Sequence, residues 1–560
     1  MTEYDLKAVN LPRLTGGALR LFTELVDNPA TSPLLMGNLM ETGGLTKLRT
    51  LKVDEPPTFS PLAYAAGMES GSPPDLETIA RTPSPANGFA FAAVRDYADA
   101  YRSRRVTPED AARRVLDAIK DSESHTPPMR LFIAVNADDV AAQAHASAQR
   151  YRDGKPLSIF DGVPVAIKDE VDMVPYPTTV GTKFLGRSPA RADSTAVARL
   201  RAAGALLIGK TNMHEIGINP IGFNAHHGTP RNPYGVGHYT GGSSSGSAAA
   251  VAAGLCPVAI GADGGGSIRI PSAFCGVAGL KATFGRVSEY GAFPLCWSVA
   301  HVGPLAATAT DCALAYAIIA GPDPNDPNSQ HQPPVTLDGF GDADLRGLTL
   351  GVYRPWFNHA TPDIVSACEA MLKTLENAGA QIREIEIPEL EAGRIAHAVT
   401  ILSEMANGME KYRAEHSREH APDVRINLAI GRACTSRDYL QAQRIRTRAM
   451  AHFANALKQV DVIVTPTTAI TAPPIRGDVL PSGESDLSVV TEAMRFVIPG
   501  NFTGLPAISF PAGYDSRGLP IGFQAMGKHW HEHTLLRIAR AAETSIVRKA
   551  PEVHYKILDS

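Results

Sequence analysis

A run of glycines that ends in a serine, Gly264-Gly265-Gly266-Ser267, has the make-up of a nucleophile beside an oxyanion hole. Without side chains to crowd them, consecutive backbone amides could bind the negative oxygen that forms when the Ser267 hydroxyl attacks a carbonyl. Asp263 precedes the run and Arg269 follows it, and we expect these two to pair in support of the loop rather than to react. Taken alone, the segment could equally be a tight structural turn.

A second stretch places serines directly ahead of a helix-forming segment. Gly241-Gly242-Ser243-Ser244-Ser245 runs through Gly246-Ser247 into Ala248-Ala249-Ala250-Val251. A flexible Gly/Ser linker would not normally continue into an alanine-rich, apolar segment. Glycines ahead of a helix start let backbone amides and small hydroxyls converge on one point, which suits catalysis or anion binding.

A third stretch ends an apolar run with a lysine. Val163 to Ile167 reads as a buried strand, and Lys168 follows it. A lysine at such a position usually reaches the surface. One that is held in a dry pocket has its charged form disfavoured, and it can then act as a base.

Together the three stretches resemble the amidase signature family, in which a lysine, a bridging serine in a cis peptide and a nucleophilic serine form the triad. The resemblance implies that Lys168 is the base, Ser243 the bridging serine and Ser267 the nucleophile. It implies a cis peptide bond at Gly242-Ser243, a supporting role for Ser244, and chemistry without a metal or organic cofactor. The oxyanion hole would be formed by backbone amides of the loop, from Gly264, Gly265, Gly266 and Ser267.

The resemblance extends from about Gly88 to Ala542. It implies a serine amidohydrolase that cleaves carboxamide bonds through an acyl-Ser267 intermediate. Within the family, Leu14-Thr15-Gly16, Arg95-Asp96-Tyr97 and Met494-Arg495-Phe496-Val497 are similar to fatty acid amide hydrolases of the plant type. That similarity implies a substrate with a lipid acyl chain, such as an N-acylethanolamine, and a homodimer.

The elements that must position these residues alternate between short apolar runs and helical stretches. Ala205–Ile208 and Val460–Val464 read as strands, while Ser194–Ala203 and Thr534–Glu543 read as helices. Thr107 can cap a helix that starts at Pro108 and runs through Lys120. The pattern predicts an α/β fold with a mixed, twisted central β-sheet surrounded by α-helices.

The N-terminal region is expected to form a helical extension ahead of this body. Leu19, Phe22 and Val26 form the apolar stripe of a short helix near Gly17 to Asp27, which could pack on its own core, touch a membrane surface or contact a second copy. Prolines between Pro56 and Pro85 indicate an irregular connector. We therefore divide the chain into an N-terminal helical extension with its connector (1–87), a catalytic domain (88–548) and a C-terminal tail (549–560), with a surface loop at 322–344.

The composition narrows the class of protein. In 560 residues, 20% are charged and 44% hydrophobic, which is typical of a globular protein. A net charge of -4 without blocks of like charge argues against a nucleic-acid partner. Six cysteines scattered singly indicate buried, reduced thiols. The N-terminus lacks the pattern of a secretory signal, and glycines and Pro257 interrupt the longest uncharged run, so we expect a cytoplasmic or peripherally membrane-associated protein.

Other interpretations compete with this one. Gly204–Thr211 matches the phosphate-loop pattern GxxxxGKT, but its middle residues are apolar and read as a strand. His529-Trp530-His531-Glu532-His533 could suggest a metal site, although we expect a solvated loop there. A glutamine-dependent amidotransferase A subunit would share all three stretches, and so would a noncatalytic docking protein with an amidase fold.

Overall fold

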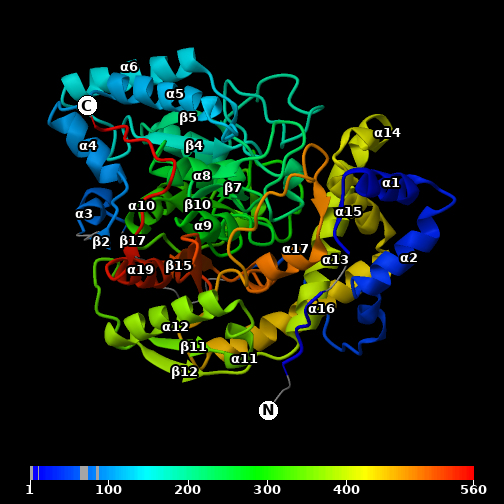
Figure 1. Cartoon of the computed structure of the whole chain (residues 1–560). Helices are drawn as coiled ribbons and strands as arrows, with labels where there is room; N and C mark the ends of the chain where they lie inside the picture. Colours follow the sequence, from blue (N-terminus) through cyan, green and yellow to red (C-terminus); the bar gives the residue numbers. More distant parts are fainter. Residues whose placement is uncertain (1–3, 10–11, 64–72, 83–86, 560) are drawn as a thin grey trace.

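An eleven-stranded mixed sheet forms the centre of the computed structural model, which describes residues 4–9, 12–63, 73–82 and 87–559 (Figure 1). Part of the predicted connector, 64–72 and 83–86, lies outside these residues. The strand order is β12-β11-β13-β16-β15-β9-β10-β8-β4-β5-β3. In chain order the strands are β3 Phe132–Ala134, β4 Pro164–Lys168, β5 Leu206–Thr211, β8 Val258–Ala262, β9 Ala278–Lys281, β10 Val302–Ala306, β11 Thr349–Val352, β12 Gln381–Glu384, β13 Val462–Pro466, β15 Ala507–Tyr514 and β16 Pro520–Gly527.

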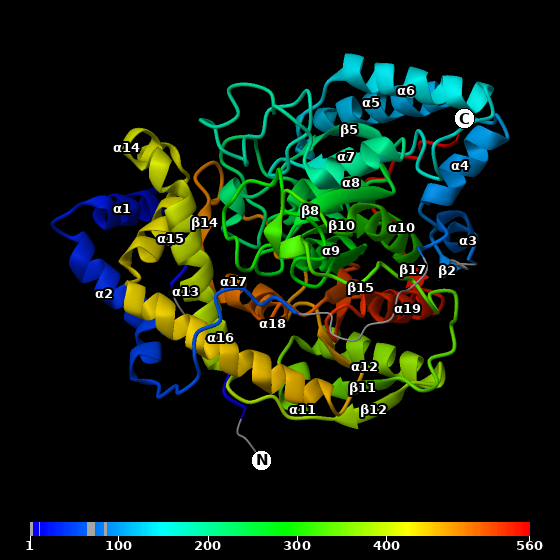
Figure 2. The ribbon, with the colours of Figure 1, turned by 180° about the vertical axis from the view of Figure 1, so that it is seen from behind.

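Helices surround the sheet, with α5 and α6 near its β5 end and α12 beside β11 and β12 (Figures 1 and 2). The predicted α/β fold with a mixed central sheet is therefore confirmed. The helices are α1 Gly16–Asp27, α2 Ser32–Thr42, α3 Leu76–Ala80, α4 Val94–Arg102, α5 Pro108–Ser124, α6 Ala137–Arg152, α7 Thr195–Ala202, α8 Ser245–Ala252, α9 Arg269–Cys275, α10 Ala309–Ile319, α11 Arg354–Phe357, α12 Pro362–Asn377, α13 Leu390–Met409, α14 Arg413–His416, α15 Pro422–Ala433, α16 Ser436–Leu457, α17 Leu487–Met494, α18 Ile498–Phe502 and α19 Glu532–Glu543.

Three two-stranded sheets complete the fold. They pair β1 (Leu14–Thr15) with β14 (Glu484–Ser485), β2 (Asn87–Gly88) with β17 (Val547–Arg548), and β6 (Arg231–Asn232) with β7 (Gly235–Tyr239). The first two tie segments from near the start of the chain to segments close to its end.

Parallel strands at the centre of the sheet set the position of the catalytic candidates. β4 pairs in parallel with both β5 and β8, and every residue of these strands is buried. Parallel strands that are covered on both faces are usually continuous apolar runs, so this part of the sheet could be predicted from the sequence. Because β4 and β8 run in the same direction, Lys168 and Ala262 both lie where their strands end at one edge of the sheet.

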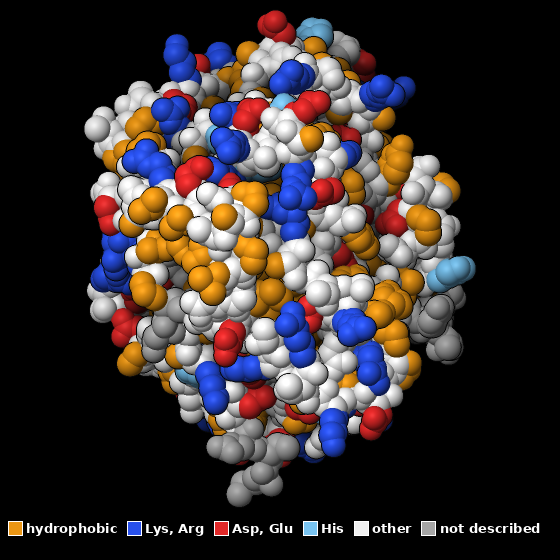
Figure 3. Space-filling model, turned by 90° about the vertical axis from the view of Figure 1, so that its right-hand side faces the viewer, with side chains coloured by type: hydrophobic (Ala, Val, Ile, Leu, Met, Phe, Trp, Pro, Cys, Tyr) orange, Lys and Arg blue, Asp and Glu red, His pale blue; other side chains and the backbone are white. Residues whose placement is uncertain are grey.

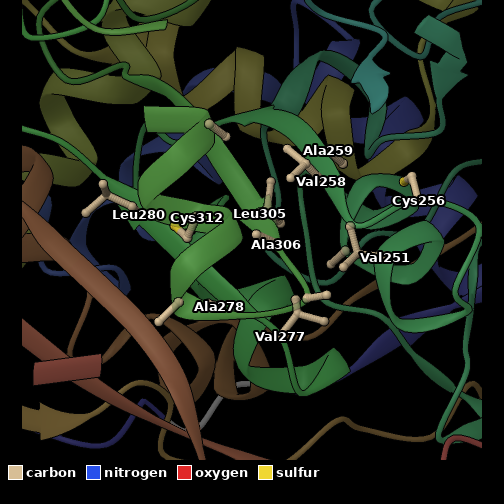
Figure 4. Packing of buried hydrophobic residues seen from close by; sticks show 14 of the residues in the cluster. Val251, Cys256, Val258, Ala259, Val277, Ala278, Leu280, Leu305, Ala306 and Cys312 are labelled. Atoms are coloured by element: carbon tan, nitrogen blue, oxygen red, sulfur yellow. The ribbon is translucent and has the colours of Figure 1, made fainter. Parts of the chain in front are cut away.

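Helix α8 is buried on every side, and its small residues make that burial possible. A Cβ at Gly246 would lie 2.2 Å from the carbonyl oxygen of Leu131, so only glycine fits there. In Figure 4, Val251 of α8 belongs to the same buried apolar cluster as Val258 of β8 and Leu305 of β10. The serines that precede α8 are thus held by a tightly packed element.

The predicted helix start at Pro108, with its cap at Thr107, is confirmed. Thr107 Oγ1 accepts the Asp110 N–H at 3.1 Å, and the Asp110 carboxylate accepts the Thr107 N–H at 3.2 Å, a reciprocal cap for α5. The helix continues past the predicted end at Lys120 to Ser124.

The N-terminal helix packs on the main body through one face. Leu19, Thr23 and Val26 of α1 are buried, and α1 lies against α15. Arg425 of α15 pairs with Asp27 at 2.5 Å. The opposite face of α1 leaves leucines exposed. None of the helices in the described ranges combines the length and the apolar character that a bilayer-spanning helix needs.

Candidate active site

Lys168 is fully buried at the end of β4, as a working base requires. Its Nζ donates to Ser243 Oγ at 2.7 Å and to the Ala262 carbonyl oxygen at 3.2 Å. Lys168 is therefore buried and does not reach the surface as a lysine at the end of a strand usually does.

The serine-rich segment holds Ser243 against the lysine. The Gly242-Ser243 peptide bond is cis, as the family resemblance implied. Ser244 Oγ donates to the Ala262 carbonyl at 3.1 Å and accepts the Ala262 N–H at 3.3 Å, which fixes the segment to the end of β8. The carbonyl of Ser267 accepts the Ser244 N–H at 3.2 Å, so Ser267 lies beside the same segment. The structure therefore brings Lys168, Ser243 and Ser267 together.

A carboxylate that the sequence analysis missed also contacts the lysine. Glu170 Oε2 lies 2.7 Å from Lys168 Nζ, and Glu170 is 6% exposed. Glu170 lies in the tight turn that follows β4, where the Val171 N–H donates to the Lys168 carbonyl at 3.0 Å, so a carboxylate this close in sequence to Lys168 was a signal that could have found it. The contact adds a carboxylate to the polar partners of Lys168 Nζ.

The glycine loop offers fewer free amides than expected. The Gly266 N–H donates to Asp263 Oδ1 at 2.6 Å, so this amide already has an acceptor. Among the described residues, no group accepts a hydrogen bond from the amides of Gly264, Gly265 or Ser267. These three N–H groups remain as candidate oxyanion donors.

Asp263 and Arg269 form a buried ion pair beneath the loop, as predicted. Arg269 Nε lies 3.0 Å from Asp263 Oδ2, and neither side chain is exposed. Burial alone would raise the pKa of the Asp263 carboxyl, but the Arg269 guanidinium and its hydrogen bonds outweigh burial and hold that pKa well below its usual range. Asn501 Nδ2 donates to Asp263 Oδ1 at 2.9 Å. Asn501 is fully buried and supports the nucleophile loop from the core.

Apolar side chains surround the glycine loop. A Cβ at Gly264 would lie 2.7 Å from Cys296 Sγ, and one at Gly266 would lie 2.5 Å from Val497 Cγ2. Glycine is therefore needed in the loop for two reasons: a side chain would clash with these neighbours, and it would crowd the backbone amides. The side chains around it are Cys296, Ile401, Met494 and Val497, with His397.

Two further buried groups lie close to the loop. Lys281 Nζ is 3.2 Å from His301 Nε2, and burial holds the pKa of Lys281 well below its ordinary value. Burial and the neighbouring Lys281 likewise lower the pKa of His301. Lys281 ends β9 as Lys168 ends β4, so the same strand-ending pattern could have predicted it.

The competing sites are absent where the sequence suggested them. Residues 206–211 form strand β5, and Lys210 is buried 3.4 Å from Asp169, so Gly204–Thr211 is not an exposed phosphate loop. The solvated loop predicted for 529–533 is wrong: Trp530 and Glu532 are buried, because the segment starts α19 and Glu532 accepts the Thr283 N–H at 2.8 Å. Within the described ranges, no three His, Cys, Asp or Glu side chains gather as a metal site would need.

The cysteines follow the prediction with one exception. Five of the six are buried, whereas Cys434, just after α15, is only partly buried. Among the described residues all six are free thiols.

Comparison with known proteins identifies this chain as an amide-hydrolysing enzyme and gives its family. A family model described as Amidase matches residues 113–536. The chain belongs to the amidase family.

Individual members of the family are similar to this chain over most of its length. The chain is similar to a fatty acid amide hydrolase of Arabidopsis thaliana, with 41% identity over 100% of this chain and 97% of that protein. It is 36% identical to one subunit of the glutamyl-tRNA(Gln) amidotransferase of Thermosynechococcus vestitus, over 78% of this chain and 95% of that protein. The solved structure of a peptide amidase from Stenotrophomonas maltophilia aligns with a TM-score of 0.72 at 29% identity, over 84% of this chain and 100% of that one.

Proposed function

We propose that this chain is a serine amidohydrolase that cleaves fatty acid amides, N-acylethanolamines among them, through an acyl-Ser267 intermediate. The observation that carries the proposal is the 2.7 Å hydrogen bond from buried Lys168 to Ser243, next to Ser267 and a glycine loop with open amides. Such a chain of groups can remove the proton from a serine hydroxyl as that hydroxyl attacks a carbonyl.

Acylation begins with proton transfer along this chain. The Ser267 hydroxyl gives its proton to Ser243, and Ser243 gives its own proton to Lys168, which must be neutral to accept it. Glu170 lies 2.7 Å from the same Nζ, so its carboxylate is a further acceptor for a proton carried by Lys168. The Ser267 oxygen then bonds to the amide carbon, and loop amides bind the resulting oxyanion; each such donor is worth roughly 10²–10³ in rate.

Collapse of the tetrahedral intermediate breaks the carbon–nitrogen bond. The departing nitrogen needs a proton, which Ser243 supplies while it regains one from Lys168. Water then attacks the Ser267 ester by the same relay and releases a carboxylic acid. The products are a fatty acid and an amine, and these steps need only the named side chains, the loop amides and water.

The lipid substrate has support from two directions. The similarity to plant fatty acid amide hydrolases covers the whole chain, including the N-terminal helices. Apolar side chains also line the glycine loop at Ile401, Met494 and Val497, where an acyl chain bonded to Ser267 would start. These contacts favour an apolar acyl group over a polar one.

We also propose that the N-terminal helices contact a lipid surface. Leu21 of α1 is 64% exposed and Leu34 of α2 is 82% exposed. Figure 3 shows hydrophobic and basic side chains together on the face of the molecule that carries these helices in Figure 1. Exposed leucines of this kind gain free energy when a bilayer interface covers them.

Intact-mass spectrometry after exposure to a fluorophosphonate tests the chemistry. We expect one adduct, at Ser267, that Ser267→Ala abolishes. Ser272→Ala is a matched control, because Ser272 Oγ is buried and donates to the Ile268 carbonyl outside the proposed relay. Labelling that survives Ser267→Ala would refute the mechanism.

Hydrolysis of N-acyl amides of increasing chain length tests the substrate. Preference for long acyl chains is expected, and turnover of short amides alone would keep the chemistry but discard the lipid substrate. Lys168→Ala should reduce turnover strongly and move its optimum to higher pH, because hydroxide must replace the base. No labelling and no turnover would instead favour a noncatalytic docking protein or an amidotransferase component that lacks its partners.

A further inference from the structure

His397 reaches the glycine loop from a helix distant in sequence. It lies in the first half of α13 and is 1% exposed. Its Nε2 is 2.9 Å from the carbonyl oxygen of Gly264. The mechanism above gives this buried histidine no part, although it touches the loop that carries the candidate oxyanion donors.

The direction of the hydrogen bond follows from the chemistry of its two partners. Burial lowers the pKa of His397 to about 4, so the imidazole is neutral at pH 7. A carbonyl oxygen can only accept, so the neutral ring must carry its proton on Nε2. Phe502 meets the ring edge to face, with centroids 6.1 Å apart, and helps to fix its orientation.

The hydrogen bond to the Gly264 carbonyl also determines the direction of the Gly265 N–H, because the two groups belong to one peptide unit. A trans peptide unit is planar, so the carbonyl of Gly264 and the N–H of Gly265 belong to one rigid plane and point in opposite directions. Holding the Gly264 oxygen toward α13 therefore turns the Gly265 N–H away from α13. That N–H has no acceptor among the described residues and is free for a ligand.

We propose that His397 is a positioning residue, which holds the Gly264 carbonyl so that the Gly265 N–H faces the oxyanion formed at Ser267. The inference rests on the proposed function, because it assumes that Ser267 is the nucleophile.

The packing around Gly265 gives the contact little freedom. A Cβ at Gly265 would lie 3.0 Å from Cε1 of His397 and 2.9 Å from Cε of Met494. Glycine at this position is free to adopt many backbone conformations in the absence of an external constraint. The imidazole supplies that constraint on one side of the peptide.

Two substitutions separate the hydrogen bond from the packing. His397→Gln keeps an N–H donor near the position of Nε2, whereas His397→Leu fills much of the space without a donor. Thr400→Val on the same helix is the control: Thr400 is buried, and its hydroxyl accepts from Gln443 at 2.9 Å and donates to the Ala396 carbonyl at 2.8 Å, so its hydrogen bonds lie outside the glycine loop. It measures what a lost buried hydrogen bond in α13 does by itself.

The rate of phosphonylation by a fluorophosphonate, resolved into its limiting rate constant and its half-saturating concentration, is the readout. Loss of one well-oriented oxyanion donor costs roughly 10²–10³ in rate, so a misdirected one should cost about 10- to 100-fold. We expect His397→Leu to lower the limiting rate constant by that factor with little change in half-saturation. His397→Gln and Thr400→Val should stay within about threefold of the parent, on the same scale.

Two outcomes would overturn the inference: a limiting rate constant in His397→Leu like that of Thr400→Val, or an equal loss in His397→Gln and His397→Leu. Ser267→Ala keeps these outcomes distinct from failure of the proposed function. If Ser267→Ala abolishes the adduct while His397→Leu reacts normally, only the role of His397 is refuted. If labelling survives Ser267→Ala, the proposed function fails and this inference fails with it.

Discussion

Replacing Arg269 by methionine removes the cation that neutralises Asp263 beneath the nucleophile loop. Arg269 Nη2 donates to Asp263 Oδ1 at 3.2 Å and to Asn501 Oδ1 at 2.5 Å, and its Nη1 donates to Gln524 Oε1 at 2.7 Å. Methionine fills part of the same space but donates none of these bonds. The Asp263 carboxylate would then remain buried without its counter-charge.

The expected cost follows from that burial. Removing one partner of a fully buried ion pair typically lowers the free energy of unfolding by about 3–5 kcal/mol, mainly because the other charge is left uncompensated. We expect a loss in this range for Arg269→Met. Because Asp263 also accepts the Gly266 N–H, the loop should move, and phosphonylation at Ser267 should slow as well.

Urea unfolding at pH 7, followed by tryptophan fluorescence, measures the loss. Arg201→Met is the control, since Arg201 pairs with Asp193 at 2.7 Å but leaves 34% of its side chain exposed. An exposed pair of this kind is worth about 0–1 kcal/mol. If Arg269→Met costs no more than Arg201→Met, the claim that the buried pair stabilises the loop is refuted.

Three further predictions concern the pH dependence of stability at two buried carboxyl groups and the binding of lipid vesicles. Burial raises the pKa of Asp311 to about 7 from 3.8, so its stabilising contribution is lost as pH rises between these values; Asp311→Asn should therefore lose less stability between pH 5 and 8 in urea unfolding. Burial would raise the pKa of Glu215, but His226 and His420 outweigh it and lower that pKa from 4.5 to about 2, so the contribution is lost as pH falls through this window. Glu215→Gln should be less stable than the parent at pH 6, and the difference should shrink as pH falls to 3. Combined Leu21→Ser and Leu34→Ser should weaken co-sedimentation with anionic vesicles about tenfold or more, and unchanged binding would refute the lipid contact.

The sequence alone predicted those parts of the fold and the candidate site in which the reactive residues lie next to the element that positions them. Each correct prediction depended on residues that are close together in the chain. Examples are the buried lysine at the end of a strand, the serines before α8 and the reciprocal cap of α5. Strand β5 was predictable because it opens with the apolar run Leu206 to Ile208, which is typical of a buried parallel strand and not of a phosphate loop. The pairing of Asp263 with Arg269 was predictable because only five residues lie between them.

The supporting contacts were not predictable, because they join segments far apart in the chain. His397 and Asn501 reach the loop across more than a hundred residues, and no local pattern distinguishes them from other core residues. The segment at 529–533 was misread because three histidines look polar, although Glu532 is held in the core by the Thr283 amide. The homodimer and the domain boundaries at 87 and 548 stay predictions, which light scattering and limited proteolysis would check.

The hydrogen bonds of Arg269 also determine when during synthesis the site can exist. Asn501 and Gln524, two of its acceptors, are among the last residues of the main body to be made. At about 5–20 residues per second, the ribosome needs on the order of half a minute to two minutes to reach them. Until then the nascent chain contains Ser243 and Ser267 but lacks Asn501 and Gln524, which hold Arg269 beneath the nucleophile loop. We therefore expect that a nascent chain shorter than this does not react with a fluorophosphonate on the ribosome.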